Sequence, residues 1–168
     1  MTILAIDPGC RTGIALSDGS SETLDFRKHD DIAKAACEFQ RILLSFFQSD
    51  HVKRLVIERP FFSRYSKHTY LTLALINAAH MVACKHDIPR HELGADQVRK
   101  TLLGRARRLK GEPVSAFDRH ICKAVEKKGF HPRTEHEADA AALLIAYTVK
   151  NNIDLGLSIL RQSQAVII

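Results

Sequence analysis

The sequence contains no run of about 20 apolar residues, which is the length that a helix needs to cross a bilayer. Its first residues, MTILAIDPG, have no basic residue before the apolar run and no small-residue cleavage site. They therefore predict a strand and not a secretion signal. We expect a cytoplasmic protein that does not associate with membranes.

Cysteines are few and scattered. Cys10, Cys37, Cys84 and Cys122 form no CxxC pair, which argues against a zinc knuckle or a disulfide framework. The last three fall within helical patterns, where a buried cysteine acts as a small apolar residue. We expect a structural role for them.

Acidic residues are outnumbered by basic ones. The chain has 25 Lys and Arg against 19 Asp and Glu, so its net charge is +6, which favours a polyanionic partner. Apolar residues at 45% and charged residues at 26% are typical of globular proteins and exclude wholesale disorder. A length of 168 residues corresponds to one ordinary domain and excludes a large multidomain machine.

Hydrophobic patterning predicts one mixed α/β domain over residues 1–150. The helix over 68–86 is apolar almost all round, including Met81, which predicts burial on most sides. The tail 151–168 fits a strand, a helix or a partner contact. The expected strands are 2–7, 13–18, 22–28, 53–58 and 89–94, and the expected helices are 30–48, 68–86, 96–104, 113–128 and 135–150.

Four residues with metal-binding chemistry stand at the ends of predicted elements. Asp7 ends the first strand at Ile-Asp-Pro-Gly, and Glu58 ends the fourth at Val-Ile-Glu-Arg-Pro. His136 and Asp139 begin the last helix, where a spacing of three residues puts them on one face. Active sites of open α/β sheets form beyond the carboxyl ends of strands. We expect the four side chains to meet if the two strands are parallel neighbours.

Each of these residues also has an ordinary structural explanation. An Asp before Pro-Gly is a common turn former, and Glu135, Glu137 and Asp139 could all complement the dipole at a helix start. Glu58 is the hardest to explain in this way, because it directly follows Leu-Val-Ile. Three carboxylates in a small space resist ionising together, and a divalent cation relieves their repulsion. Hard oxygen ligands with one imidazole suit Mg²⁺ or Mn²⁺.

The ordered motifs Ile-Asp-Pro-Gly-x-x-x-x-Gly-Ile-Ala, Val-Ile-Glu and His-x-x-Asp-Ala-Ala resemble the RuvC family of Holliday junction resolvases, in the RNase H-like superfamily. The resemblance runs from about residue 3 to 150 and implies an α/β fold that is RNase H-like, with a five-stranded mixed β-sheet flanked by α-helices. By motif position it implies that Asp7, Glu58, His136 and Asp139 are catalytic and hold two Mg²⁺ ions, for which Mn²⁺ would substitute. Family members carry either Asp or His at the position of His136. Glu135 and Glu137 flank it as candidate accessory ligands.

The activity implied by the resemblance is metal-dependent, structure-selective DNA cleavage. Four-way (Holliday) junctions would be resolved by paired symmetric nicks that leave a 5′-phosphate and a 3′-hydroxyl, through two-metal hydrolysis of the phosphodiester. A homodimer with a twofold axis would match the symmetry of this branched DNA.

A basic strip spans residues 99–110, RKTLLGRARRLK, and contains no acid. Such a strip near a metal site would neutralise phosphates and make DNA binding dependent on salt, although a charge run is more commonly a solvated loop. Gly104 and Gly111 suggest a loop that is mobile until DNA binds. The candidate DNA contacts are Arg99, Lys100, Arg105, Arg107, Arg108 and Lys110.

Aromatic and basic residues alternate after Glu58. Phe61, Phe62 and Arg64 could stack on unpaired bases and hold the backbone. The resemblance implies that Phe61 wedges into the centre of the junction. The alternative is that one or both phenylalanines pack under the loop.

Three other functions remain open. An RNase H-type nuclease would share the chemistry but cut RNA in hybrids. A non-catalytic branched-DNA-binding protein would share the fold, and the presence of all four candidate ligands argues against it. An actin-like ATPase shares a similar first motif, but it normally needs two such subdomains.

Overall fold

A computed structural model describes residues 2–49, 52–60 and 67–153. Its centre is a five-stranded sheet in the order β3-β2-β1-β4-β5. The strands β1, β2 and β3 are antiparallel to one another in turn, whereas β4 runs parallel to β1 and β5 parallel to β4. This confirms the expected mixed sheet. The strands are β1 (Thr2–Asp7), β2 (Arg11–Leu16), β3 (Ser21–Asp25), β4 (Val52–Arg59) and β5 (Arg90–Gly94).

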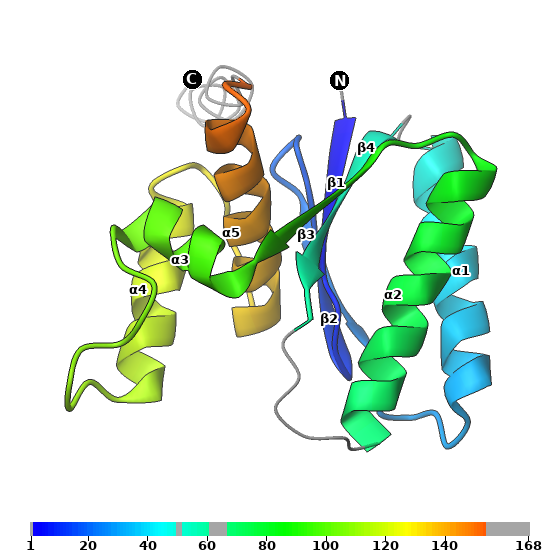
Figure 1. The fold of residues 1–168 in the computed structure, drawn as a ribbon, viewed down its shortest axis with the longest axis horizontal. Coiled ribbons are helices and arrows are strands. Elements are labelled where there is room, and N and C mark those ends of the chain that lie inside the picture. The colour runs from blue at the N-terminus through cyan, green and yellow to red at the C-terminus, as the bar shows by residue number, and fades with distance from the viewer. Residues whose placement is uncertain (1, 50–51, 61–66, 154–168) are drawn as a thin grey trace, which may run out of the picture.

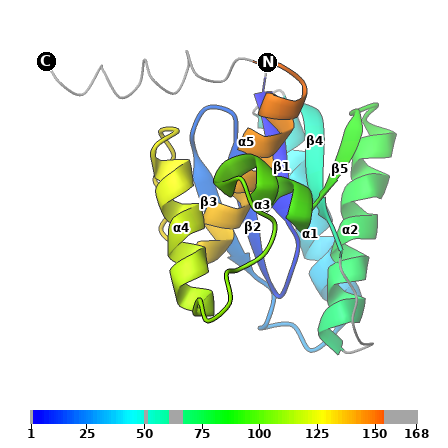
Figure 2. The ribbon, with the colours of Figure 1, turned by 60° about the vertical axis from the view of Figure 1, so that its left-hand side comes forward.

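Helices cover both faces of the sheet (Figure 1). The pair α1 and α2 packs on one face, and α5 packs on the other, with α3 and α4 outside it (Figure 2). No helix in the described ranges is long and apolar enough to span a bilayer. The helices are α1 (Ile32–Ser49), α2 (Lys67–Lys85), α3 (Ala95–Leu103), α4 (Val114–Glu126) and α5 (Glu135–Lys150).

Strand alternation divides the core into two clusters. Ile3 and Ala5 of β1 belong to the cluster under α5, whereas Leu4 and Ile6 belong to the cluster under α1 and α2. On β4, Val56 lies on the α5 side. Because side chains alternate between faces, Asp7 and Glu58 continue the rows that face α5.

Most element boundaries agree with the sequence-based expectation to within two residues, and the largest difference is at β3, which ends at Asp25 and not at residue 28. The second strand runs from Arg11 to Leu16, two residues earlier than expected, because Asp18 is already part of a turn. Its carboxylate accepts hydrogen bonds from the amide and the hydroxyl of Ser20, and Gly19 adopts a φ of 97° between them. This turn reverses the chain into β3.

Two expectations about burial are wrong. Met81 is 65% exposed and Tyr70 is 55% exposed. One face of α2 is therefore open to solvent, although the apolar sequence of the helix predicted burial on most sides. Cys37 and Cys84 are exposed as well, whereas Cys10 and Cys122 are half-buried, and all four are free thiols. The buried residues of α2, which include Leu75, Ala79 and Val82, belong to the core cluster shared with α1 and the sheet. Of the expected tail 151–168, the part from 154 onward lies outside the described residues.

Candidate active site

The carboxyl ends of β1 and β4 bring two acids together. Ile6 pairs with Ile57 in the parallel ladder, so Asp7 and Glu58, the next residues on each strand, stand side by side. Both continue the row that faces α5, as the alternation of the buried residues requires. The expectation that the two strands are parallel neighbours is confirmed.

A glycine lets α5 approach the same place. Gly13 pairs with Asp7 across the β1–β2 ladder. A Cβ built on Gly13 would lie 1.8 Å from the carbonyl oxygen of His136, which is too close for any side chain. The first turn of α5 therefore rests directly on β2, and this brings Asp139, one turn further along, over the end of β1.

The electrostatics show that Asp7, Glu58 and Asp139 form one group, called the carboxylate cluster below. Burial, then the charges of Glu58 and Asp139, raises the pKa of Asp7 well above its ordinary value. Burial and the charge of Asp139 raise the pKa of Glu58 to about 7. Burial is also the main reason why the pKa of Asp139 rises to about 6. Carboxyl groups that hold their protons near neutral pH mark a place that needs positive charge.

Arg99 supplies part of that charge. It lies on α3, and its guanidinium lowers the pKa of all three carboxyl groups of the cluster. It also sits 5.6 Å above the centre of the buried Phe117 ring, which fixes its position. The sequence placed Arg99 in the basic strip, but nothing in its spacing indicated that it would face the acids.

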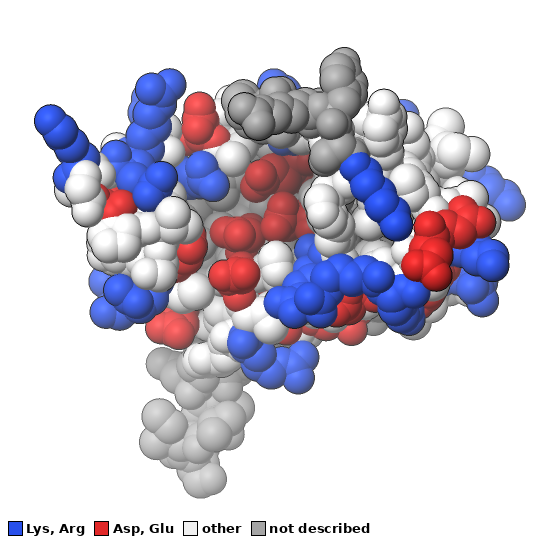
Figure 3. Space-filling model, turned by 90° about the horizontal axis from the view of Figure 1, so that it is seen from below, with Lys and Arg blue, Asp and Glu red and all other residues white. Residues whose placement is uncertain are grey.

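The cluster opens into a cavity of about 700 Å³. Seen from the end where the parallel strands finish, acidic side chains gather in the middle of the surface and basic side chains surround them (Figure 3). The lining includes Asp7 and Glu58 from the sheet, His68 and Thr72 from α2, and Arg99 and Arg107 from the α3 side. An anionic ligand would be held by the rim while its reacting group faces the acids.

The donor chemistry of the cluster fits Mg²⁺ or Mn²⁺, since all three side chains offer hard carboxylate oxygens. Their raised pKa values fit as well, because a bound cation would remove the repulsion that keeps them protonated. In the ranges that the structure describes, no group of three or more His, Cys, Asp or Glu side chains is already drawn to metal-binding distances.

His136 takes a different position from the three acids. Its Nε2 lies 3.7 Å from a carboxylate oxygen of its neighbour Glu135. Within the described ranges, no hydrogen bond or ion pair joins it to Asp7, Glu58 or Asp139. Glu135 itself is close enough to raise the pKa of Asp139. His136 as a metal ligand remains a prediction.

Glu137 is a structural residue and does not join the cluster. Its buried carboxylate accepts hydrogen bonds from the hydroxyls of Ser21 and Thr23 and from the amide of Arg133, at 3.1, 3.4 and 2.9 Å. Its own amide donates to the side chain of Thr134, the N-cap of α5. Glu137 thus fastens the start of α5 to β3, and its candidacy as an accessory ligand is wrong.

The predicted DNA-binding residues fall into three groups. Lys100 is exposed on α3, and Arg107, Arg108 and Lys110 are exposed on the following loop. Arg105 is engaged: its guanidinium donates two hydrogen bonds to Glu112, at 2.6 and 2.7 Å. Phe61, Phe62 and Arg64 lie outside the described residues.

A thiol–imidazole contact beside the cavity was not foreseen. The Sγ of Cys10 lies 2.7 Å from the Nδ1 of His68. The two residues are 58 positions apart, in the turn after β1 and in the first turn of α2. Neither residue carries a local sequence signal for this pairing, because only the tertiary fold brings the two segments together.

The sheet order, the helical layers and the position of the carboxylate cluster define an RNase H-like fold. No protein-family model matches the sequence, and no curated protein matches it either. Among solved structures, the fold is similar to that of Thermus thermophilus RuvC, with a TM-score of 0.72 and 19% identity over 91% of this chain and 98% of that chain. It is equally similar to T. thermophilus RuvC in complex with a Holliday junction substrate, with a TM-score of 0.72 and 18% identity over 91% of this chain and 96% of that one. The chain therefore has a RuvC-like fold.

Proposed function

We propose that this chain is a metal-dependent, structure-selective DNA endonuclease that resolves four-way junctions by paired symmetric nicks. The observation that carries the proposal is the carboxylate cluster, in which Asp7, Glu58 and Asp139 come from two parallel strands and a helix and share raised pKa values. A RuvC-like fold with a neighbour solved on a Holliday junction supports the choice of substrate. The products would be a 5′-phosphate and a 3′-hydroxyl.

Asp7, Glu58 and Asp139, with His136 as a fourth ligand, would hold two Mg²⁺ or Mn²⁺ ions. Bound there, the ions would supply Lewis-acid activation of water and of the scissile phosphate. The cavity rim would orient the DNA backbone, because Arg99 and Arg107 line the same cavity as the acids. Arg99 would also face the phosphate, since it already lies within the electrostatic reach of all three carboxylates.

A second copy of this chain would complete the enzyme. A four-way junction has two equivalent cleavage positions, and a twofold dimer presents two equivalent sites. The open face of α2 is the surface we assign to this contact, because Tyr70 and Met81 expose 55% and 65% of their area there, spaced along one face of the helix. Replacing Met81 with Lys should convert the dimer to a monomer in sedimentation velocity, whereas an unchanged dimer would place the contact elsewhere.

A nicking assay tests the proposed activity. Wild type, Asp7→Asn and the exposed-acid control Asp30→Asn would each be incubated with a mobile four-way junction, a matched linear duplex and an RNA–DNA hybrid, in Mg²⁺ and in Mn²⁺. We expect paired nicks in the junction alone, lost in Asp7→Asn and kept in Asp30→Asn. Cleavage of the hybrid alone would identify an RNase H-type nuclease. Tight junction binding without any cleavage would identify a non-catalytic branched-DNA-binding protein.

A further inference from the structure

The loop between α3 and α4, residues 104–112, is held in one shape. Gly104 and Gly111 adopt φ values of 71° and 82°, which turn the chain out of α3 and back toward α4. The glycines suggest mobility in the sequence, but the interior of the loop is tied by side-chain hydrogen bonds. The loop descends on the side of the molecule where the parallel strands end (Figure 1), and its Arg107 lines the cavity of the carboxylate cluster.

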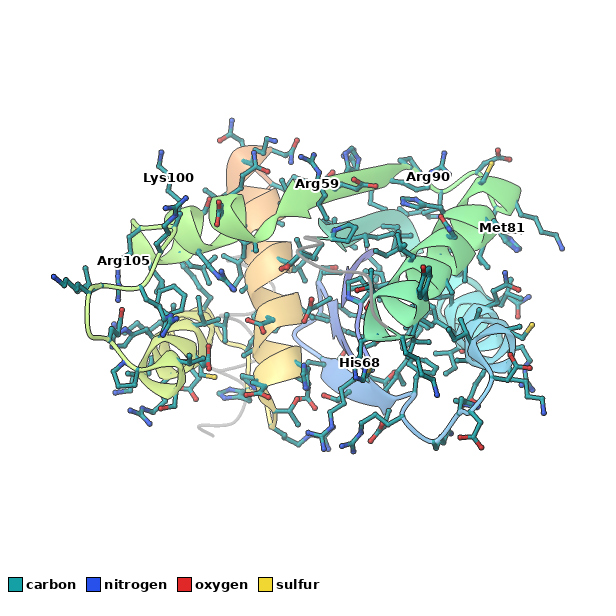
Figure 4. The ribbon with its side chains drawn as sticks, turned by 60° about the horizontal axis from the view of Figure 1, so that its bottom comes forward. Arg59, His68, Met81, Arg90, Lys100 and Arg105 are labelled. Atoms are coloured by element: carbon teal, nitrogen blue, oxygen red, sulfur yellow. The ribbon has the colours of Figure 1, made fainter. Side chains whose placement is uncertain are left out.

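Glu112 is the centre of these ties. Its carboxylate accepts two hydrogen bonds from Arg105 and a third, at 2.8 Å, from the amide of Leu109. His120 on α4 contributes a further contact at 3.2 Å. The guanidinium of Arg105 in turn lies 5.1 Å above the Phe117 ring, which anchors the loop to the body of the protein. Figure 4 shows Arg105 beside the loop, with Lys100 pointing outward from α3.

The ties leave Leu109 pointing into solvent. Its amide donates to the Glu112 side chain, and its carbonyl accepts from the Glu112 amide at 3.0 Å, so its backbone is fixed on both sides. Its side chain is nevertheless 64% exposed. Single exposed apolar residues are common on protein surfaces. This one differs because an ordered loop holds it at the tip, between the exposed cations Arg108 and Lys110.

We propose that Leu109 is a wedge that inserts between base pairs in an arm of the bound DNA, while Arg107, Arg108 and Lys110 grip the phosphates beside it. Proteins that bend DNA use this combination, in which an apolar side chain unstacks one base step and flanking cations hold the backbone. The charge around Leu109 favours DNA over a protein surface as the binding partner. The three nearest exposed charged residues of the loop are all positive, and its acid, Glu112, is only 10% exposed and already hydrogen-bonded.

The wedge would act away from the cleavage point. Arg107 reaches the cavity, whereas Leu109 lies two residues further along the loop, so the inserted base step would belong to the arm that leaves the cluster. Glu112 is a positioning residue here, since it sets the direction of Leu109 without touching DNA. This inference rests on the proposed function, and it adds a contact that would favour arms that bend easily.

The test uses four-way junctions that carry 2-aminopurine, a base whose fluorescence rises when it is unstacked, at successive positions along one arm. Wild type should raise the fluorescence at one position away from the crossover. Leu109→Ala should abolish that rise and weaken junction binding about five- to tenfold, with an unchanged salt slope because every cation remains. Val149→Ala, which shortens another aliphatic side chain with 55% exposure at the far end of α5, should match wild type.

The variant Glu112→Gln tests whether the orientation of Leu109 matters in addition to its presence. It keeps Leu109 but weakens the ties that aim it, so the fluorescence rise should shrink while the protein stays folded. A Leu109→Ala protein that retains the full rise would overturn the wedge, as would a wild type that cuts junctions without unstacking any arm position. A wild type that binds no junction would overturn both the wedge and the proposed function, so the two failures are distinguishable.

Discussion

The start of α5 carries two acids, Glu137 and Asp139, that meet opposite surroundings. Glu137 faces β3 and receives three hydrogen bonds, from Ser21, Thr23 and the amide of Arg133. Asp139 faces the ends of β1 and β4, where its nearest charged neighbours include other carboxylates and its pKa rises to about 6. Burial with donors stabilises the fold, whereas burial among like charges costs stability and is expected only where a ligand compensates. We therefore assign a structural role to Glu137 and propose a functional role for Asp139 on the same helix.

The largest effect should come from removing one acid of the cluster. We expect Asp7→Asn to lower junction cleavage by about 1,000-fold or more, because a ligand is lost while the basic surface stays. The same variant should melt at a higher temperature than wild type when no metal is present, since a buried carboxyl group that resists ionising among like charges is gone. Single-turnover nicking and calorimetry measure the two effects. A drop in both activity and melting temperature would mean that Asp7 is structural, like Glu137.

Replacing Glu137 should lower the stability of the protein, whereas replacing Asp7 should raise it. Replacing Glu137 with Gln exchanges one of its two accepting oxygens for an NH2 group that faces the same donors, and we expect the free energy of unfolding to fall by about 2–3 kcal/mol. Urea denaturation measures this loss, with Glu135→Gln as a matched control because its side chain is 63% exposed. The control should stay within about 0.5 kcal/mol of wild type. Equal losses of stability in the two variants would contradict the structural role assigned to Glu137.

The carboxylate cluster should make the folded protein less stable as the pH rises. The pKa of Glu58 rises from 4.5 to about 7 and that of Asp139 from 3.8 to about 6, so the folded protein binds protons more tightly than the unfolded chain. The contribution of the cluster to stability is therefore largest below pH 4 and is lost as the pH rises through 7. Mg²⁺ at pH 8 should restore it. A melting temperature at pH 8 that ignores Mg²⁺ would contradict the cation-binding role.

The smallest effect belongs to the basic loop. Arg107→Ala with Arg108→Ala should weaken junction binding and lower the slope of log affinity against log salt by about 1 to 2. Lys34→Ala with Arg41→Ala removes the same charge from α1, on the other side of the sheet, and should leave the slope unchanged. Equal slopes in both double variants would show that the loop does not contact the backbone.

The sequence predicted the parts of the site that depend on local pattern. Asp7 and Glu58 were recognisable because each ends a buried apolar strand, and strand alternation then fixes the face on which they lie. The open face of α2 was missed, because apolar residues on all sides of a helix do not reveal which side lacks a neighbour. The sequence also could not show that Arg99 faces the acids.

Contacts between distant segments could not be predicted from the sequence, because they depend on the tertiary fold and not on local pattern. Glu137 and Asp139 are two positions apart in one motif, and only the position of β3 decides that the first accepts hydrogen bonds from Ser21 and Thr23. The glycine at position 13 looked like an ordinary strand residue until the carbonyl of His136 was placed against it. Arg105 looked like a free cation until Glu112 was found to bind it.

The most direct test of the central claim is a titration of the carboxyl groups in the metal-free protein by ¹³C NMR. We expect Glu58 to titrate near pH 7 and Asp139 near pH 6, both above their ordinary values. We also expect Asp139→Asn to lower the pKa of Glu58, because the charge of Asp139 helps to raise it. Ordinary pKa values near 4 for both groups, unchanged in the variant, would contradict the claim that these acids form one cluster whose charge Arg99 compensates only in part.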